Sequence, residues 1–268
     1  MADRKCGCKG IRSCLLCEGI NTQNTDIITW PENHTIHFYC VECRKAFLEL
    51  DHSSHAMGES IPFPGISIVT NFITEEEEQG LCQQIYKTPF VVSQSGRHKQ
   101  DFGPKVNFKK KKLRMEKFTG LPNYARTLVE RMHSLAELQD FQPVELCNLE
   151  YSSERGAAID PHFDDFWIWG DRLVTLNLIS DSILSFTNDS DPCVEVQVPL
   201  LQRSLIIVTD EARNVWKHGI HRHHISSTRM AMTFRELTPE FLDGGERASD
   251  GQQLINISLT FEGCAVGL

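Results

Sequence analysis

Two histidines and one aspartate have the types and the spacing of a metal-binding set. His162 and Asp164 are two residues apart, so on an extended segment both side chains leave the same face and one ion could lie against them. His218 comes much later, just past an apolar run at 204–209 that predicts a buried strand. Two imidazoles and one carboxylate can hold one face of an octahedral iron and leave three positions open, as in non-haem Fe(II) oxygenases. The pattern therefore predicts an oxidative enzyme.

Spacing alone leaves the third ligand open. His221, His223 and His224 follow His218 closely and offer the same donor atoms. An H-x-D pair also occurs by chance in many chains, and a histidine beside a strand is more often an ordinary side chain than a ligand. The residue pattern therefore supports a metal site without choosing among these histidines.

Two arginines, Arg229 and Arg235, lie on an apolar segment that predicts a strand. A period of two places the following residues on its two faces: Arg229, Ala231, Thr233 and Arg235 on one, and Met230, Met232 and Phe234 on the other. Inward guanidinium groups on such a strand are costly unless an anion pairs with them. A small dicarboxylate such as 2-oxoglutarate would supply the anion, because guanidinium binds carboxylate through a bidentate fork.

Several segments resemble the AlkB family of Fe(II)/2-oxoglutarate dioxygenases. The stretch SLIIVT at 204–209, followed by EARNVWKHGI at 211–220, resembles the family's segment before the third iron ligand, and RMAMTFR at 229–235 resembles its R-x-x-x-T-F-R strand. IPFPGI at 61–66 and NFITEEEE at 71–78 resemble its first strand and helix, so the likeness covers about residues 60 to 262. The start CGCKGIRSCLLC at 6–17 and IDPHFDD at 159–165 narrow it to the branch of the fourth animal homologue.

The resemblance implies roles for individual residues. Iron would be held by His162, Asp164 and His218, while Arg229 would bind the distal carboxylate of 2-oxoglutarate and Arg235 would lie near the end that chelates iron.

Tyr151 stands where family members place a tyrosine that binds the co-substrate. The usual N-x-Y motif has one extra residue here, Asn148-Leu149-Glu150-Tyr151, and Asn148 is carried over as a further contact on this imperfect match. Some members also have a polar residue two positions after the first arginine, where this chain has Ala231. The distal clamp is therefore expected to rely on Arg229 and Tyr151.

Apolar patterning predicts a mainly β (α+β) fold, a double-stranded β-helix (jelly roll) with flanking helices. A capping box at Thr74 and an apolar face with Leu81 and Ile85 predict one helix, and a second is expected from Pro122. Short β-rich runs follow at 144–151, 173–179, 194–200, 205–209, 230–234 and 254–261. About eight such strands make a jelly roll.

Length and composition predict one catalytic domain at 60–268 after a Cys-rich segment at 1–59. The start of the chain has no apolar stretch and no run is long enough to cross a bilayer, so we expect an intracellular protein of the cytoplasm and nucleus with no membrane partner. In that reducing setting the 10 cysteines are expected to be thiols or metal ligands.

The amino-terminal cysteines are a second candidate metal site. Four thiols lie within twelve residues: Cys6, Cys8, Cys14 and Cys17. Cys40-x-x-Cys43 offers two more, with His34 and His37 nearby. Paired thiolates at short spacing suit tetrahedral zinc, which would help to fold a segment that has no core of its own. Exposed thiols, a redox pair or an iron–sulfur cluster are the alternatives.

A basic stretch at 97–114 is the third signal. It holds eight lysines and arginines against one acid, Asp101, although the whole chain has a net charge of −9, which argues against a non-specific DNA coat. The resemblance implies that this stretch is a substrate-recognition lid, with aromatic and basic side chains that could grip a nucleic acid. A solvated loop, or a surface that contacts an acidic protein, would have the same pattern. The candidate substrate residues are Arg97, Lys99, Phe102 and Lys105, with Asp160 and Asp165 flanking the iron site.

The resemblance implies oxidative demethylation, in which hydroxylation of an N-methyl group leads to loss of formaldehyde. The substrate would be methyl-lysine in a protein, with actin as the target and actomyosin components as partners, or N6-methyladenine in DNA. The acidic chain and the two flanking aspartates favour the protein substrate. The alternative is an adaptor that recruits partners through its metal-binding start, with catalysis secondary.

Overall fold

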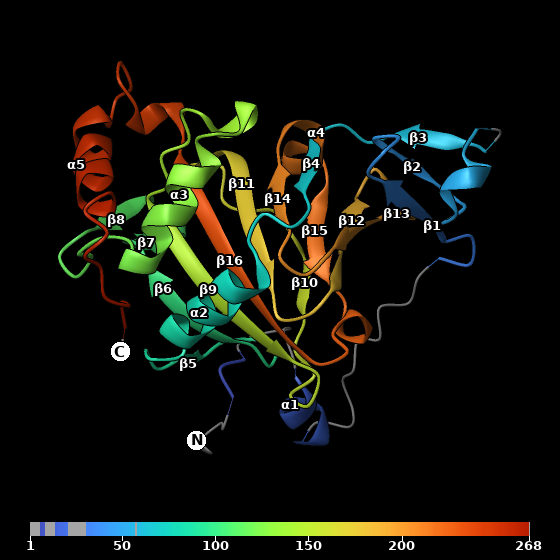
Figure 1. Cartoon of the computed structure of the whole chain (residues 1–268), viewed down its shortest axis with the longest axis horizontal. Coiled ribbons are helices and arrows are strands. Elements are labelled where there is room, and N and C mark those ends of the chain that lie inside the picture. The colour runs from blue at the N-terminus through green and yellow to red at the C-terminus, as the bar shows by residue number, and fades with distance from the viewer. Residues whose placement is uncertain (1–5, 9–13, 21–30, 57, 268) are drawn as a thin grey trace.

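Two seven-stranded sheets form the body of the molecule (Figure 1). The computed structural model describes residues 6–8, 14–20, 31–56 and 58–267. The major sheet has, in spatial order, β4 (Ile66–Val69), β14 (Leu205–Val208), β11 (Trp169–Leu178), β16 (Thr228–Leu237), β9 (Glu145–Ser152), β6 (His98–Phe102) and β5 (Val91–Val92). The minor sheet has β10 (Ile159–His162), β15 (Lys217–Ile220), β12 (Ser182–Asn188), β13 (Asp191–Leu200), β1 (Thr35–Cys40), β2 (Lys45–Phe47) and β3 (Ser60–Pro62). These sheets confirm the predicted jelly roll.

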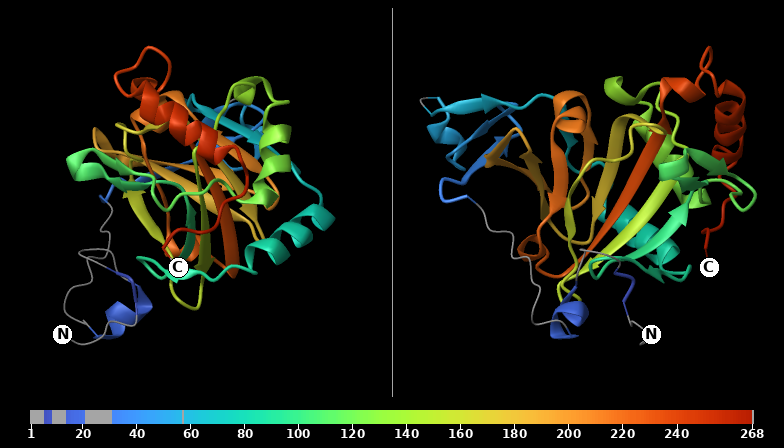
Figure 2. Two further views of the ribbon diagram at one scale, coloured as in Figure 1. Left: turned by 90° about the vertical axis from the view of Figure 1, so that its left-hand side faces the viewer. Right: turned by 180° about the vertical axis from the view of Figure 1, so that it is seen from behind.

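Helices flank the sheets and are short. They are α1 (Leu15–Ile20), α2 (Glu75–Ile85), α3 (Arg126–Met132), α4 (Asp210–Asn214) and α5 (Ala248–Ser258). A separate hairpin is formed by β7 (Lys105–Asn107) and β8 (Lys112–Arg114). Figure 2 shows α1 below the ends of the strands and α5 at the side of the molecule opposite β1 to β3. None of the helices within the described ranges has the length and apolarity needed to cross a membrane.

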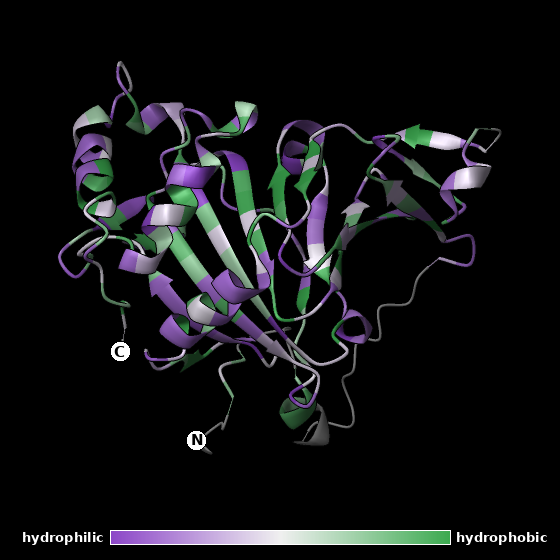
Figure 3. Cartoon of the chain, in the orientation of Figure 1, coloured by the Kyte–Doolittle hydropathy of each residue, from purple (hydrophilic) through white to green (hydrophobic). Residues whose placement is uncertain are grey.

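The two faces of β16 meet different surroundings, as its period of two predicts. Met230, Met232 and Phe234 pack in the hydrophobic core between the major sheet and helices α2 and α3. Arg229 and Arg235 line a cavity between the two sheets. Figure 3 shows hydrophobic residues along β11 and β14 and mostly hydrophilic residues along α2. The sheet therefore has one dry face and one face that carries charge.

Helix α2 begins as predicted. The hydroxyl of Thr74 accepts a hydrogen bond from the amide of Glu77 at 3.2 Å, and the Glu77 carboxylate accepts one from the Thr74 amide at 2.8 Å. The second helix, α3, begins later than predicted, at Arg126, because one turn of 3-10 helix at Asn123–Ala125 follows Pro122.

The predicted strand at 254–261 is wrong, since most of this run belongs to helix α5. Apolar residues at alternate positions from Ile255 onward imitate a strand, but the buried residues of the helix are Gly251, Leu254 and Ser258, which follow a helical spacing. A Cβ atom at Gly251 would lie 1.8 Å from the carbonyl oxygen of Phe241. This close approach of glycine to backbone is a tertiary contact, so the local pattern did not reveal it.

Strands β1 to β3 join the main body rather than stand apart. β1 pairs in parallel with β13, with Thr35 opposite Val194, and then pairs with β2, which pairs with β3. The boundary expected at residue 59 thus lies between two strands of one sheet. Strands β1 and β2 of the amino-terminal segment therefore extend a sheet of the catalytic fold.

Glu78, which is buried on α2, generates a prediction about stability. Its carboxylate accepts hydrogen bonds from the Ile179 amide at 2.7 Å and from the Gln202 side chain at 2.7 Å, which ties the helix to two turns of the sheets. Glu78→Ala should lower the free energy of unfolding by about 1–3 kcal/mol, because it leaves these donors without a partner. Urea denaturation followed by circular dichroism measures the change. Gln83→Ala, at an exposed position of the same helix, is the control, and an equal decrease in both variants would contradict the assignment.

Candidate active site

The three predicted iron ligands lie close together in the wall of the cavity between the two sheets. One ligand atom from each of His162, Asp164 and His218 lies within 4.8 Å of the others. The two histidines are direct partners in the antiparallel pairing of β10 with β15, and their ring centroids are 4.5 Å apart. Asp164 follows in the loop after β10, with one carboxylate oxygen 3.7 Å from Nε2 of His162. The fold thus brings His218 to the His162 and Asp164 pair, from which it is distant in the sequence.

The orientation of His162 is set by its own backbone neighbour. Its Nδ1 lies 2.9 Å from the carbonyl oxygen of Asp160. A carbonyl oxygen can only accept a hydrogen bond, so Nδ1 carries the proton and Nε2 keeps its lone pair. Ligating histidines in metal sites have this arrangement, in which the second nitrogen donates to a fixed acceptor.

Asp164 is held ionised by Arg235. Nε and Nη2 of Arg235 donate to the two carboxylate oxygens at 2.9 and 3.3 Å, and Nη1 donates to Glu145 at 2.6 Å. Burial raises the pKa of Asp164, but the charge and the hydrogen bonds of Arg235 lower it, and the pKa lies below its ordinary value. Burial, with the neighbouring His162, lowers the pKa of His218 to about 3. The site therefore holds a carboxylate and a neutral imidazole, the forms that bind a metal.

Arg213 supports the same loop and was not identified from the sequence. It is 1% exposed, and its guanidinium donates to the carbonyl oxygens of Asp164, Asp165 and Trp169 at 3.2 to 3.3 Å. The guanidinium also lies 4.4 Å from the centre of the Phe166 ring. Arg213 therefore fixes the path of the backbone that presents Asp164. Its position within the stretch at 211–220, which resembles the AlkB family, was the feature of the sequence that could have identified it.

At the other end of the cavity Arg229 has an unused donor. The side chain is 2% exposed, its Nε donates to Asn177 at 2.6 Å, and it lies 5.0 Å from the centre of the Tyr151 ring. Its Nη1 is buried without a hydrogen-bond partner among the described residues. Burial lowers the pKa of Arg229, as expected for a guanidinium with no buried anion beside it. A carboxylate of 2-oxoglutarate fits this environment.

Asn177 positions Arg229 and was also missed. Its amide nitrogen donates to the carbonyl oxygens of Ser180, Leu200 and Leu201 at 2.9 to 3.1 Å. These contacts direct the amide oxygen toward Arg229. A polar residue in the middle of the apolar run at 173–179 was the signal in the sequence.

The prediction that Asn148 contacts the co-substrate is wrong. Tyr151 and Leu149 line the cavity, and Asn148 lies on the opposite face of β9 because strand side chains alternate. Its amide donates to Gln100 at 2.9 Å and to the Tyr124 hydroxyl at 2.8 Å. Leu149 therefore occupies the position two before the tyrosine, where the family motif has asparagine.

Among the candidate substrate residues, Phe102 is a core residue. It is 2% exposed and packs edge-on against Tyr124, so a substrate role for its ring is excluded. Arg97 is 5% exposed and lies 6.0 Å from the centre of the Tyr151 ring. Lys99 forms an ion pair with Asp101.

The remaining candidates lie on two different elements. Lys105 is exposed on β7, at the base of the lysine-rich hairpin. Asp165 accepts hydrogen bonds from the amides of Trp167 and Ile168 at 2.9 and 3.3 Å, which gives it a structural task in the loop. Asp160 lies on β10 beside His162. Substrate roles for Arg97, Lys99, Lys105, Asp160 and Asp165 stay predictions.

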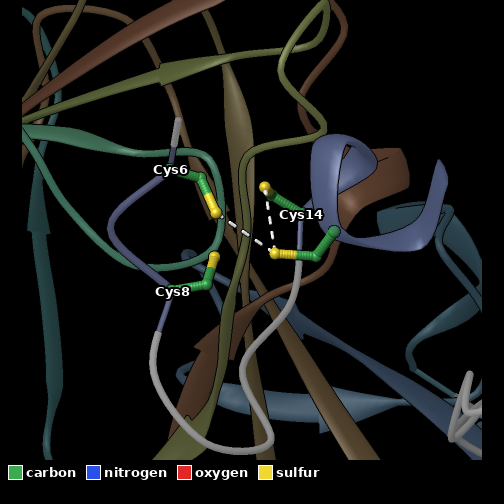
Figure 4. Close-up of side chains that lie close together, drawn as sticks. Cys6, Cys8 and Cys14 are labelled. Carbon is green, nitrogen blue, oxygen red and sulfur yellow. Dashed lines mark hydrogen bonds between the residues drawn. The ribbon is translucent and has the colours of Figure 1, made fainter. Parts of the chain in front are cut away.

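The amino-terminal thiols converge, as predicted for a metal site. The sulfur atoms of Cys6, Cys8, Cys14 and Cys17 lie within 4.8 Å of one another. Figure 4 shows Cys6, Cys8 and Cys14 with their sulfur atoms directed toward a common centre. The Cys8 sulfur accepts a hydrogen bond from the Ser95 amide at 3.1 Å, and burial raises the pKa of its thiol to about 12. Four thiol sulfurs at this separation suit tetrahedral zinc.

Comparisons with known proteins agree with this geometry. No protein-family model matches the chain. "Alpha-ketoglutarate-dependent dioxygenase alkB homolog 4" is 44% identical in Homo sapiens and 41% in Mus musculus, over 97% of this chain and 95% and 96% of those proteins. The "DNA N6-methyl adenine demethylase" of Caenorhabditis elegans is 38% identical over 91% of both chains. The solved structure of OsALKBH1 has a TM-score of 0.50 at 13% identity over 66% of this chain and 100% of that one, and so shares the fold.

The near full-length relatives and the converging residues lead to one conclusion. The paired histidines and aspartate fit Fe(II), and the unpaired buried guanidinium fits 2-oxoglutarate, which is another name for alpha-ketoglutarate. The chain belongs to the AlkB family of Fe(II)/2-oxoglutarate dioxygenases, is similar to its fourth homologue, and is an oxidative demethylase that uses these two cofactors.

Proposed function

We propose that the chain removes methyl groups from monomethyl-lysine in a protein, with actin as the target and actomyosin components as partners. With iron and 2-oxoglutarate bound, O2 would be the oxidant: one of its oxygen atoms would enter succinate as 2-oxoglutarate loses CO2, and the other would hydroxylate an N-methyl group, which is then lost as formaldehyde. His162, Asp164 and His218 would hold the iron, and Arg229 beside Tyr151 would bind the distal carboxylate of 2-oxoglutarate. Arg235 directs its donors to Asp164 and Glu145, so its task is to orient the aspartate ligand.

The aromatic and acidic side chains of the loop after β10 are the main support for methyl-lysine as the substrate. Phe163 and Phe166 flank Asp164 and Asp165 in the sequence, their ring centroids are 5.4 Å apart, and Phe166 is 50% exposed. Arg213 covers one part of the Phe166 ring, which leaves the exposed part free for a ligand. Aromatic faces beside carboxylates are the surroundings that recognise methylated ammonium groups. Asp160 and the net charge of −9 also favour a cationic substrate over a polyanion.

N6-methyladenine in DNA is the second candidate, and a different surface supports it. The tip of the β7–β8 hairpin carries Lys109, Lys110, Lys111 and Lys112, all of them exposed. Phe108 is 48% exposed beside them. Lysines that contact phosphates and an aromatic ring that stacks on a base are the usual contacts to a single strand. The nematode relative, named as a DNA demethylase, points the same way.

The proposal extends to the amino-terminal cysteines and to the place of action. Zinc at Cys6, Cys8, Cys14 and Cys17 would hold this segment against the loop that contains Ser95. The cytoplasm and nucleus are the proposed compartments. An adaptor role for the segment, with catalysis secondary, predicts that a variant without iron ligands still performs the cellular task.

The iron ligands provide the first test of function. His162→Ala or Asp164→Ala should abolish substrate-dependent formation of succinate, because each removes one of three ligands. Circular dichroism checks that the fold is kept. His223→Ala, at an exposed histidine of the neighbouring segment, is the control and should retain activity. Unchanged turnover in the His162 and Asp164 variants would refute the role of the triad.

The co-substrate clamp provides the second test. Arg229→Lys keeps the charge but loses the bidentate fork, so the affinity for 2-oxoglutarate should fall by about 1.5–3 kcal/mol, or roughly ten- to 150-fold in Kd. Calorimetric titration of the iron-loaded protein measures the change. Arg131→Lys, which alters a surface pair with Glu77, serves as the control. Equal affinity in the Arg229 variant and the parent would show that another group anchors the co-substrate.

The choice of substrate is tested with two opposed variants. Phe166→Leu keeps apolar bulk but removes the aromatic face, so KM for a methyl-lysine peptide should rise roughly two- to thirtyfold, in keeping with about 0.5–2 kcal/mol for a cation–π contact. Changing Lys109, Lys110, Lys111 and Lys112 to Ser should leave peptide turnover unchanged. Formaldehyde release is the measurement, and Phe108→Ala is the aromatic control.

Methylated DNA is the other substrate in this experiment. If it is the true substrate, each lysine that no longer binds a phosphate should reduce the slope of log affinity against log salt by roughly 0.7–0.9. Absence of DNA demethylation in the quadruple lysine variant, together with no peptide activity in the parent, would replace methyl-lysine by methyladenine as the substrate.

A further inference from the structure

A second group of metal-binding side chains lies at the turn between β1 and β2, outside the active site and away from the amino-terminal thiols. It consists of Cys40, Cys43, His52 and His55, whose ligand atoms lie within 4.8 Å of one another. We propose that these four residues bind a zinc ion that joins the β1–β2 turn to the segment leading into β3. His34 and His37 precede these cysteines closely in the sequence, but His34 lies against Glu195 instead, at 3.5 Å.

The distances between the donor atoms fit tetrahedral zinc. Nδ1 of His52 lies 3.2 Å from the Cys40 sulfur and 3.6 Å from the Cys43 sulfur, and Nδ1 of His55 lies 3.7 Å from the Cys43 sulfur. Zinc bonds to sulfur and nitrogen at tetrahedral angles place these atoms about 3.6 Å apart. Four protein ligands fill the coordination shell, as in structural zinc sites, and leave no position open for catalysis.

His55 is already in the tautomer that a metal requires. Its Nε2 lies 2.9 Å from the carbonyl oxygen of Glu49, so Nε2 carries the proton and donates it. Nδ1, which faces the cysteines, therefore keeps its lone pair. The ring also stacks on Phe47, with centroids 3.8 Å apart and planes 4° apart, so its orientation is fixed. A backbone acceptor and a packed ring of this kind orient the ligating histidines of metal sites.

The backbone presents both pairs of ligands. Cys40 ends β1, and a turn returns the chain to β2 with Arg44 in the left-handed region at φ 54°. Within the turn the Cys43 amide donates to the Cys40 sulfur at 3.5 Å. Asp51 caps a 3-10 turn by accepting from the Ser53 amide at 3.1 Å, and this turn brings the two histidines to the same side.

The zinc ion would have a structural purpose because the strands around the site are short. β2 and β3 have three residues each, and β1 has six. Figure 1 shows them at the far edge of the molecule from α5, where β1 pairs with β13. Zinc would join the β1–β2 turn to the segment that leads into β3. Metal binding of this kind contributes directly to folding free energy in small units.

The test uses the full chain, purified without added metal. Zinc measured by mass spectrometry should amount to two ions per chain, one here and one at the amino-terminal thiols. The double variant Cys40→Ser with Cys43→Ser should lose one, while Glu42→Gln, which changes a carboxylate 3.1 Å from the Cys40 sulfur, should retain both. Wild-type zinc content in the double cysteine variant would overturn the proposal.

A second measurement on the unmutated protein guards against misfolding of the variant. Alkylation of thiols, followed by peptide mass spectrometry, should modify Cys40 and Cys43 slowly until a chelator is added and rapidly afterwards. The exposed Cys264 is the internal reference and should react quickly in both states. Equal rates for Cys40 and Cys43 before and after chelation, or iron without zinc in the purified chain, would refute a zinc site.

Discussion

The ion pair between Arg235 and Asp164 crosses the space between the two sheets, and the active site depends on it. Arg235 lies on β16 of the major sheet, whereas Asp164 follows β10 of the minor sheet. Breaking a buried pair by removing one partner typically costs about 3–5 kcal/mol, because the other charge stays buried. Glu145 occupies the remaining side of the guanidinium, at 2.6 Å. This network holds the aspartate ligand charged and sets its position relative to the strand that carries Arg229.

Arg229 shows the opposite electrostatic situation on the same strand. Its charge is buried beside Tyr151 and Asn177, and one of its donors has no partner within the described structure. A protein that buries an unpaired guanidinium accepts a decrease in stability that an anionic ligand can recover. The strand thus carries one arginine that is saturated by protein carboxylates and one that is available to a ligand carboxylate. This difference separates the metal-orienting role from the co-substrate role.

Two groups of cysteines and histidines lie in short segments at the edge of the catalytic fold, outside its main apolar core. The amino-terminal thiols lie against the loop at Ser95, and the proposed site at Cys40 lies at the far edge of the minor sheet. Both groups are formed by short segments whose few buried apolar side chains supply little packing energy. Coordination would supply the constraint that packing does not, which explains how a single catalytic core can retain these extensions.

The sequence by itself determined the chemistry and the general architecture. His162, Asp164, Arg229 and Arg235 were identifiable because their types are costly or reactive on strands whose period of two fixes the face. The resemblance then singled out His218, and the capping box at Thr74 located a helix. These features are local, or are carried by motifs that are continuous in the chain.

Only the tertiary structure decided which residues support the chemistry. Asn177 stands out in the sequence as a polar residue in an apolar run, and Arg213 lies in a stretch that resembles the AlkB family, but backbone groups that they bind lie in segments far away in the chain. Asn148 faces away from the cavity because it is three residues from Tyr151 on β9, and side chains an odd number of residues apart lie on opposite faces of a strand. The partners of Cys40 and Cys43 are His52 and His55 because chain reversal at a capped turn brings them close. The tertiary structure determines which side chains from distant segments come into contact. The sequence predicts such a contact only where both residues lie in the same segment.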